Sequence, residues 1–136
     1  MKCTAYKSDG KTINYISIYE HDPKTGKKIK CTTYNSDGKT INYINEYNPK
    51  TGKVIKWTLY NSDGTIDFIN EYNHQTGKKI KCTAYKSDGK TINYINEYDP
   101  QTENRIKWTS YKSDGKTINY ITEYDPKTGK QIKKAP

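Results

Sequence analysis

Residues 31–56 read CTTYNSDGKTINYINEYNPKTGKVIK, and this stretch decides the fold because the chain repeats it five times. The copies occupy residues 3–30, 31–56, 57–81, 82–107 and 108–133, followed by the tail 134–136. Each copy is too short to bury a core of its own, so the units are predicted to share a single repeat domain over residues 1–136. Copies that tile the whole chain leave little room for an independent catalytic domain.

Two turn signals divide each unit into two strands. In the second copy, Asp37 and Gly38 form the first signal, and Pro49 with Gly52 forms the second. Apolar and polar residues alternate between the turns, as they do in a pleated strand. The sequence therefore predicts an all-β fold, with tandem β-hairpins in an antiparallel up-and-down meander of about ten strands.

Such a meander can stay open or close on itself. We expect an elongated, twisted open sheet or a spiral, and a closed barrel is the less favoured alternative. Lys133, Lys134 and Pro136 at the last strand suit an exposed sheet edge, because charge and proline discourage pairing with another chain. An open sheet also leads us to expect a tendency towards edge-to-edge self-association.

The two faces of the sheet follow from the hairpin register. If Tyr34 stands opposite Ile41, simple alternation places Tyr34, Ile41, Tyr43 and Tyr47 on one face, and Ile29, Cys31 and Ile44 on the other. A hairpin one residue shorter would swap the partners. Glu46 and its equivalents are expected to pair with Lys across neighbouring strands.

Three copies depart from the common unit, and the departures are expected near turns. The third unit lacks one residue after Asp63 and Gly64, a deletion that the turn or a bulge must absorb. The first unit carries two extra residues within 16–23, which we assign to its second turn. The fourth unit has Glu103 where the others have Gly, and we expect Asn104 to adopt the left-handed conformation there.

Composition limits the classes of function. Lys and Arg outnumber Asp and Glu by 24 to 15, which gives a net charge of +9. This charge favours acidic partners, although lysine also keeps a long β array in solution. The sequence contains no apolar run of membrane-spanning length and no signal peptide after Met1, so we expect a soluble chain that is mature or trimmed from a longer secreted precursor.

One position of the unit is Cys in three copies and Trp in two, namely Cys3, Cys31, Cys82, Trp57 and Trp108. Equivalent positions in successive units lie two strands apart, about 9.6 Å, which is beyond the reach of a disulfide. The thiols are therefore expected to be free, which favours a reducing compartment such as a bacterial or host cytosol. Because no CxxC or HxxxH spacing occurs, no metal site is predicted, and no cofactor is expected.

Aromatic residues supply the candidate site. Anchors for a partner are predicted at Trp57, Trp108, Tyr43, Tyr47, Tyr94 and Tyr98. The alternative is that these rings only cover a thin sheet. No catalytic residue is predicted, because no set of nucleophile, base and orienting group occurs just once. The first hypothesis is a non-enzymatic scaffold that binds a protein partner, and the second is nucleic-acid or carbohydrate binding through Lys and Tyr ladders.

The phrase Asp88-Gly89-Lys90-Thr91-Ile92, followed by Tyr94, Glu97-Tyr98-Asp99-Pro100 and later Lys127-Thr128-Gly129-Lys130, resembles an uncharacterised tandem-repeat family of phytoplasmas and related mollicutes. The similarity covers all five units. It implies a host-associated bacterium and a protein of unknown function, often suspected to be an exported effector. More loosely, the unit is similar to YD and MORN hairpin repeats. The resemblance implies β-hairpins and carries over no catalytic residue.

Overall fold

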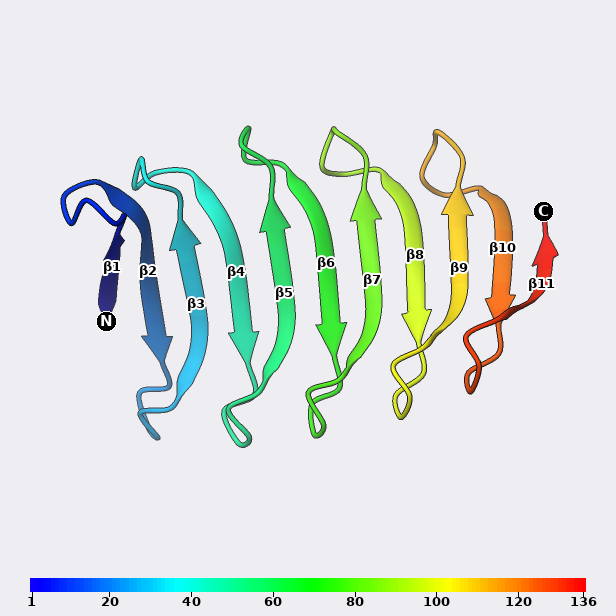
Figure 1. Ribbon diagram of the computed structural model, residues 1–136, viewed down its shortest axis with the longest axis horizontal. Coiled ribbons are helices and arrows are strands. Elements are labelled where there is room, and N and C mark those ends of the chain that lie inside the picture. The colour runs from blue at the N-terminus through cyan, green and yellow to red at the C-terminus, as the bar shows by residue number, and fades with distance from the viewer.

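The computed structural model describes residues 1–136 as a single sheet of eleven β-strands. The strands are β1 (Lys2–Tyr6), β2 (Ile13–His21), β3 (Lys28–Tyr34), β4 (Ile41–Tyr47), β5 (Val54–Tyr60), β6 (Ile66–Tyr72), β7 (Lys79–Tyr85), β8 (Ile92–Tyr98), β9 (Arg105–Tyr111), β10 (Ile118–Tyr124) and β11 (Gln131–Ala135). Each strand pairs with its neighbours in sequence, and Figure 1 shows β1 and β11 at opposite ends. The predicted all-β meander is confirmed, and the sheet is open.

The structure has a strand beyond the two that each unit supplies. In β11, Lys134 pairs with Thr122 on β10, in the same way that Trp108 on β9 pairs with Asn96 on β8. Lys134 thus occupies the Cys or Trp position of a sixth unit. The tail 134–136 was expected to follow the repeats, but residues 134 and 135 belong to a strand that continues them.

A β-bulge in every hairpin reverses part of the face assignment. Tyr34 pairs with Ile41, the first of the two registers considered, but the next pair is Thr33 with Tyr43, which leaves Asn42 as an extra residue. Tyr34 and Thr33 are adjacent on one strand and point to opposite faces. Tyr34 and Tyr43 therefore lie on opposite faces, and the assignment from simple alternation was wrong.

We name the two faces by their side chains. The aromatic face carries Cys31, Tyr43, Asn45, Tyr47, Trp57, Phe68, Asn70, Tyr72, Cys82, Ala84, Tyr94, Asn96, Tyr98, Trp108, Tyr120, Thr122 and Tyr124. The isoleucine face carries three rows of side chains that cross the strands. The bulge is what brings the tryptophan position and the tyrosines of the return strand to the same face.

The rows of the isoleucine face alternate between two residue types on successive strands. The charge row is Glu20, Lys30, Glu46, Lys56, Glu71, Lys81, Glu97, Lys107, Glu123 and Lys133. The threonine row is Thr32, Ile44, Thr58, Ile69, Thr83, Ile95, Thr109 and Ile121. The tyrosine row is Tyr34, Ile41, Tyr60, Ile66, Tyr85, Ile92, Tyr111 and Ile118.

The charge row contains cross-strand ion pairs. Four Lys to Glu contacts measure 3.4 to 3.7 Å between nitrogen and oxygen, in the pairs Lys30–Glu20, Lys56–Glu46, Lys81–Glu71 and Lys107–Glu97. The expected pairing of Glu with Lys across strands is confirmed. These side chains are substantially exposed, so each pair contributes little to stability on its own.

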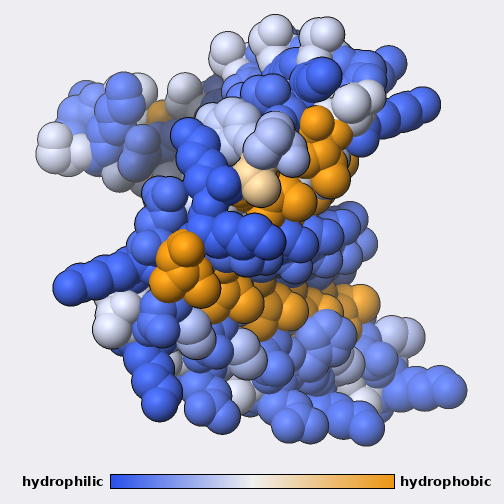
Figure 2. Space-filling model, turned by 90° about the vertical axis from the view of Figure 1, so that its right-hand side faces the viewer, coloured by the Kyte–Doolittle hydropathy of each residue, from blue (hydrophilic) through white to orange (hydrophobic).

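A sheet of one layer has no interior between layers. Only 11 of the 136 residues are buried, and nine of them are Ser, Thr or Asn in the middle of strands, where longer side chains on the same face cover them. Figure 2 shows hydrophobic side chains in bands that run back from the C-terminal end of the sheet, between hydrophilic bands. Both faces therefore expose apolar surface. The structure contains no helix that is long and apolar enough to cross a membrane.

The first turn of each unit is held by an aspartate. The carboxylate of Asp37 accepts hydrogen bonds from the backbone N–H groups of Lys39 and Thr40, each at 2.8 Å, and from the Thr40 hydroxyl. In the third unit the turn is one residue shorter, while the bulge after Tyr60 is retained. Of the two places expected to absorb the deletion, the turn and a bulge, it is the turn that does so.

The two extra residues of the first unit lie in a strand, so their assignment to a turn was wrong. β2 has nine residues where β4 has seven. Ser17 pairs with Cys3 on β1, whereas it pairs with Thr33 on β3. An insertion of two residues preserves the alternation of faces, so the strand can lengthen while every other side chain stays on its own face of the sheet. The hairpin of β1 is displaced by two residues along β2.

Glu103 adopts the left-handed conformation itself, with φ of 62°. The expectation that Asn104 would do so was wrong. The turn fixes this position through two backbone hydrogen bonds, from Glu103 N–H to the Asp99 carbonyl and from Asp99 N–H to the Asn104 carbonyl, both 2.9 Å. The Asn104 side chain is used elsewhere, because its amide donates to the Pro126 carbonyl of the next turn at 2.9 Å.

Candidate binding face

Trp57 lies on β5 between two aromatic rings of the flanking strands. Its ring centroid is 6.1 Å from that of Tyr43 on β4 and 5.3 Å from that of Phe68 on β6. Both contacts are edge-on, with interplanar angles of 73° and 84°. This geometry is favourable for aromatic pairs and holds the indole at a defined place on a sheet that has no second layer.

Trp108 on β9 repeats this arrangement. Its ring centroid is 6.3 Å from that of Tyr94 and 5.1 Å from that of Tyr120, again with edge-on geometry. Four inter-strand spacings separate β5 from β9, about 19 Å. The aromatic face therefore presents two equivalent tryptophans, each partly exposed and each held by its neighbours.

Cations lie over tyrosine rings on the same face. The distances from the cation to the ring centroid are 4.5 Å for Lys28 over Tyr19, 5.1 Å for Lys28 over Tyr47, 4.7 Å for Lys79 over Tyr98, 4.5 Å for Arg105 over Tyr124 and 4.8 Å for Lys134 over Tyr120. None of these cations belongs to one of the four ion pairs, which all lie on the other face. The aromatic face is therefore positively charged as well as aromatic.

The cysteines occupy the tryptophan position in the other units. Cys31 is 3% exposed, Cys82 is half-buried and Cys3 is exposed, and all three thiols are free. Burial raises the pKa of the Cys82 thiol, Lys79 opposes that rise, and the Asp67 carboxylate adds to it. At neutral pH the buried thiol is therefore held in its neutral form, which makes it a packing residue and a poor nucleophile.

A shallow groove of about 430 Å³ opens beside one tryptophan. It is lined by Asn45, Lys53, Val54, Trp57, Tyr72, Thr76 and Gly77. The Lys53 amino group bounds it by donating to the backbone carbonyls of Gln75 at 3.1 Å and Thr76 at 3.2 Å. The groove is wide enough for one side chain of a partner and offers it an indole, a phenol and a lysine stem.

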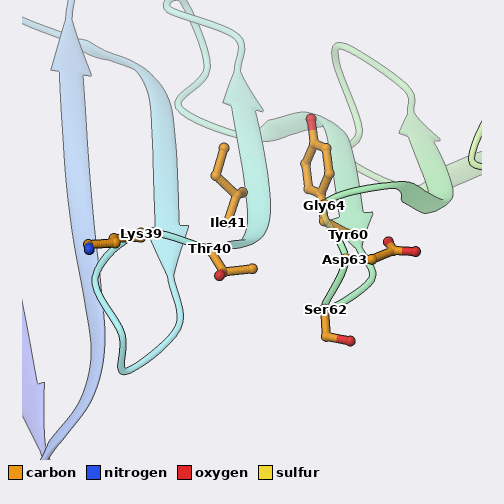
Figure 3. Close-up of a pocket in the computed structure, with 7 residues that line it drawn as sticks. All are labelled: Lys39, Thr40, Ile41, Tyr60, Ser62, Asp63 and Gly64. Atoms are coloured by element: carbon orange, nitrogen blue, oxygen red, sulfur yellow. The ribbon is translucent and has the colours of Figure 1, made fainter.

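A second shallow groove, of about 300 Å³, lies between the first turns of two units and is lined by Lys39, Thr40, Ile41, Tyr60, Ser62, Asp63 and Gly64. In Figure 3 the Lys39 amino group and the Asp63 carboxylate point in opposite directions. No nucleophile and base converge there. No cluster of three or more His, Cys, Asp or Glu side chains that could hold a metal ion is present in the structure.

The candidate tyrosines are partly shielded from water. Burial raises the pKa of Tyr47, Tyr94 and Tyr98, and neighbouring thiols add to the effect. Their hydroxyl groups are therefore neutral at physiological pH and can donate hydrogen bonds to a partner.

The structure places all six predicted anchors on the aromatic face. Simple alternation had separated Trp57 from Tyr43, and the bulge at Asn42 unites them. Sequence reasoning missed the cations over the tyrosines. Alignment of the units could have revealed them, because Lys28, Lys79 and Arg105 share one position, the first residue of the cysteine or tryptophan strand.

A sequence model described as "Protein of unknown function (DUF2963)" matches residues 6–59, 34–84, 60–109 and 85–135. The chain belongs to the DUF2963 family. The four DUF2963 matches overlap and advance by one unit each, and they begin at Tyr6, Tyr34, Tyr60 and Tyr85, the last residues of successive first strands. The family's own unit therefore spans about two of the units described above, which confirms the tandem repetition.

No curated protein matches this DUF2963 chain. Among solved structures, the crystal structure of TarM is similar, with a TM-score of 0.47 and 11% sequence identity. The alignment covers 93% of this chain and 20% of the TarM chain, so this DUF2963 chain spans about a fifth of the protein that it matches.

Proposed function

We propose that the protein is a non-enzymatic scaffold whose aromatic face binds an acidic, extended segment of a protein partner. The observation that carries this proposal is the pair of equivalent tryptophans on one face, each held edge-on by two rings and each partly exposed. Tryptophan is the residue type most enriched among interface anchors. A repeated surface gives a long contact area without an enclosed pocket.

The charge of the face indicates the chemistry of the partner. Cations over tyrosine rings, with no ion pair of their own, favour Asp and Glu side chains in the bound segment. The groove beside Trp57 suits one apolar side chain between those acidic residues. An acidic segment with occasional large apolar residues is therefore the kind of ligand that this face fits.

Nucleic-acid or carbohydrate binding is the second candidate, since lysine and tyrosine alternate along the face. Ring geometry favours a protein instead. Bases and sugars stack on open ring faces, whereas cations of the protein itself cover Tyr47, Tyr98 and Tyr124, and the tryptophans meet their neighbours edge-on.

The decisive experiment pairs variants that change opposite faces of the same strands. Trp57→Ala with Trp108→Ala removes the anchors on β5 and β9, and Tyr60→Ala with Tyr111→Ala is the matched control on the isoleucine face. Affinity capture from lysate, with quantification of each captured protein, should show specific partners lost in the first variant and kept in the second. Retention of every partner in the tryptophan variant would refute the proposal.

The second candidate has its own measurement. Titration with a single-stranded oligonucleotide at low salt, repeated at increasing salt, should show no binding if the partner is a protein. A log-linear loss of oligonucleotide affinity with salt would favour nucleic acid.

We further propose that the protein acts as an exported effector in a reducing host cytosol. The resemblance to phytoplasma and mollicute repeats supports this assignment, and so do the three free thiols. Fractionation of infected host tissue with an antibody to the chain tests it. Detection of the chain in the bacterial cells alone would contradict it.

A further inference from the structure

The isoleucine face is open and has no partner in the fold. Each of its three rows alternates between two residue types, so that even-numbered strands carry Glu in the charge row and Ile in the other two rows. The odd-numbered strands from β3 to β9 carry Lys, Thr and Tyr at the same levels, and β11 carries Lys133 and Ala135. Large apolar side chains therefore alternate with small or flat ones from strand to strand. Negative charges alternate with positive ones in the same way, so that Glu and Ile always share a strand.

A groove marks this alternation at the centre of the sheet. It has a volume of about 280 Å³ and lies over Thr83 on β7, where Ile69 on β6 and Ile95 on β8 form its walls. Glu71 and Lys81 of the charge row close one end. The small threonine between two isoleucines leaves a space that suits one more isoleucine side chain.

We propose that the isoleucine face packs against the same face of a second copy of the chain, about a twofold axis parallel to the strands between β6 and β7. This rotation places β6 of one copy over β7 of the other, and β2 over β11 at the ends. Every even-numbered strand then faces an odd-numbered one, and each row lies over the same row of the partner. The interface is isologous, as in most homodimers.

Complementarity follows in all three rows at once. In the charge row each Glu lies over a Lys, ten times across the interface. In the threonine row each Ile from β4 to β10 lies over a Thr, while Ile18 on β2 lies over Ala135 on β11. Ile69 of one copy meets the groove over Thr83 of the other. A shift by one strand would place Glu over Glu, and an axis perpendicular to the strands would place the charge row over the tyrosine row. The charges therefore require an axis that runs parallel to the strands and midway between two neighbours, and the axis between β6 and β7 is the one that pairs all ten members of the charge row.

The first hairpin supports this choice. β1 carries no member of the charge row, because the two extra residues of β2 displace its register and Lys2 pairs with Ile18. The charge row begins at Glu20 on β2 and ends at Lys133 on β11. The charge row of the ten strands from β2 to β11 is therefore complete under the proposed axis.

The available area suffices for a stable dimer. Ten strands about 4.8 Å apart and about seven residues long cover about 48 Å by about 23 Å, or about 1,100 Å² on each copy. A standard protein interface uses about 800 Å² from each partner. The two aromatic faces would then point outward on opposite sides, so that one dimer could hold two partners.

Sedimentation equilibrium tests the proposal. The wild-type chain should have twice the 15.8 kDa of one chain. Glu71→Lys puts two lysines opposite each other near the axis and should yield a monomer, while Glu71→Lys combined with Lys81→Glu should restore the dimer. Glu103→Lys makes the same charge change in an exposed turn and should leave the dimer intact.

A second variant tests the packing without changing charge. Thr83→Trp fills the groove on the isoleucine face and should also yield a monomer, with circular dichroism that retains the strand signal of the wild type. A monomeric wild type would overturn the proposal. A dimer that persists in both Glu71→Lys and Thr83→Trp would also overturn it and would place self-association at the strand edges.

Discussion

Glu103 donates its backbone N–H to the Asp99 carbonyl at 2.9 Å, as Gly52 donates to Asn48 at 2.8 Å in the equivalent turn. The turn requires φ of 62° at Glu103 and 72° at Gly52. Only the glycine adopts that conformation without a steric cost, since a Cβ in the left-handed region costs about 1–2 kcal/mol. The fourth unit therefore stores strain that the other units do not.

Glu103→Gly should raise the free energy of unfolding by about 1 kcal/mol, because relief of this strain exceeds the added entropy of glycine in the unfolded chain. Urea denaturation followed by circular dichroism measures the change. Gly52→Ala, at the equivalent turn, should move the midpoint in the opposite direction. A lower midpoint for Glu103→Gly would show that the turn is not under strain.

Acid should weaken the array through its turns. Hydrogen bonds from threonine and from backbone N–H groups lower the pKa of the turn aspartates Asp9, Asp22, Asp37, Asp63, Asp88, Asp99, Asp114 and Asp125. The pKa falls to about 2 at Asp88 and Asp114. A lowered folded-state pKa contributes stability above the unfolded value of about 4, and that stability is lost as pH falls towards about 2.

The urea midpoint should therefore decline between about pH 4 and about pH 2. A variant with Asp88→Asn and Asp114→Asn should show a smaller decline over the same interval, since two of the titrating carboxylates are gone. Equal declines in the two proteins would assign acid sensitivity to groups other than these turns.

A buried hydroxyl pair joins the displaced first hairpin to the regular array. Ser17 Oγ lies 2.9 Å from Thr33 Oγ1, and these residues are 3% and 1% exposed. Ser17→Ala leaves the Thr33 hydroxyl with only the weak Cys31 Sγ contact at 3.7 Å. The expected loss is about 1–3 kcal/mol, the cost of an unsatisfied buried polar group.

A double-mutant cycle measures this pair. Thr33→Val added to Ser17→Ala removes both polar groups, so the double variant should be less destabilised than the sum of the two single variants. Strict additivity in urea unfolding would mean that the two hydroxyls do not interact.

The three thiols should differ in reactivity. Cys3 is exposed, Cys82 is half-buried with a raised pKa, and Cys31 is 3% exposed. Labelling with a thiol reagent under native conditions should therefore modify Cys3 first, Cys82 more slowly and Cys31 last. Mass spectrometry of peptides at successive times gives the order, and urea-unfolded chain should lose the difference. Early modification of Cys31 in the native protein would contradict the packing on the aromatic face.

Much of the architecture could be predicted from sequence, because turn chemistry in each copy is explicit. Asp37 and Gly38 mark a hairpin, and Pro49 and Gly52 mark the return. The Glu to Lys pairs across strands also followed from residue type, whereas the pairing of Tyr34 with Ile41 was one of two open registers.

The faces could not be predicted, because both carry apolar and aromatic side chains. A sheet with one polar face fixes its register through the hydrophobic pattern. Here Ile44 and Tyr43 lie on opposite faces and are both half-buried. The hydrophobic pattern is therefore equally compatible with a strand that has a bulge at Asn42 and with one that has none. The tryptophan contacts with Tyr43 and Tyr94 depended on that bulge and were hidden for the same reason.

Each strand pairs only with the strands next to it in sequence. The distance between the two tryptophans is therefore set by the number of units that lie between them. Duplication or loss of one unit between Trp57 and Trp108 would change their spacing by two strands, about 9.6 Å, without altering the rings that hold either one. Recombination among the nearly identical copies can thus change the spacing of the two tryptophans in fixed steps while the local structure around each one stays the same.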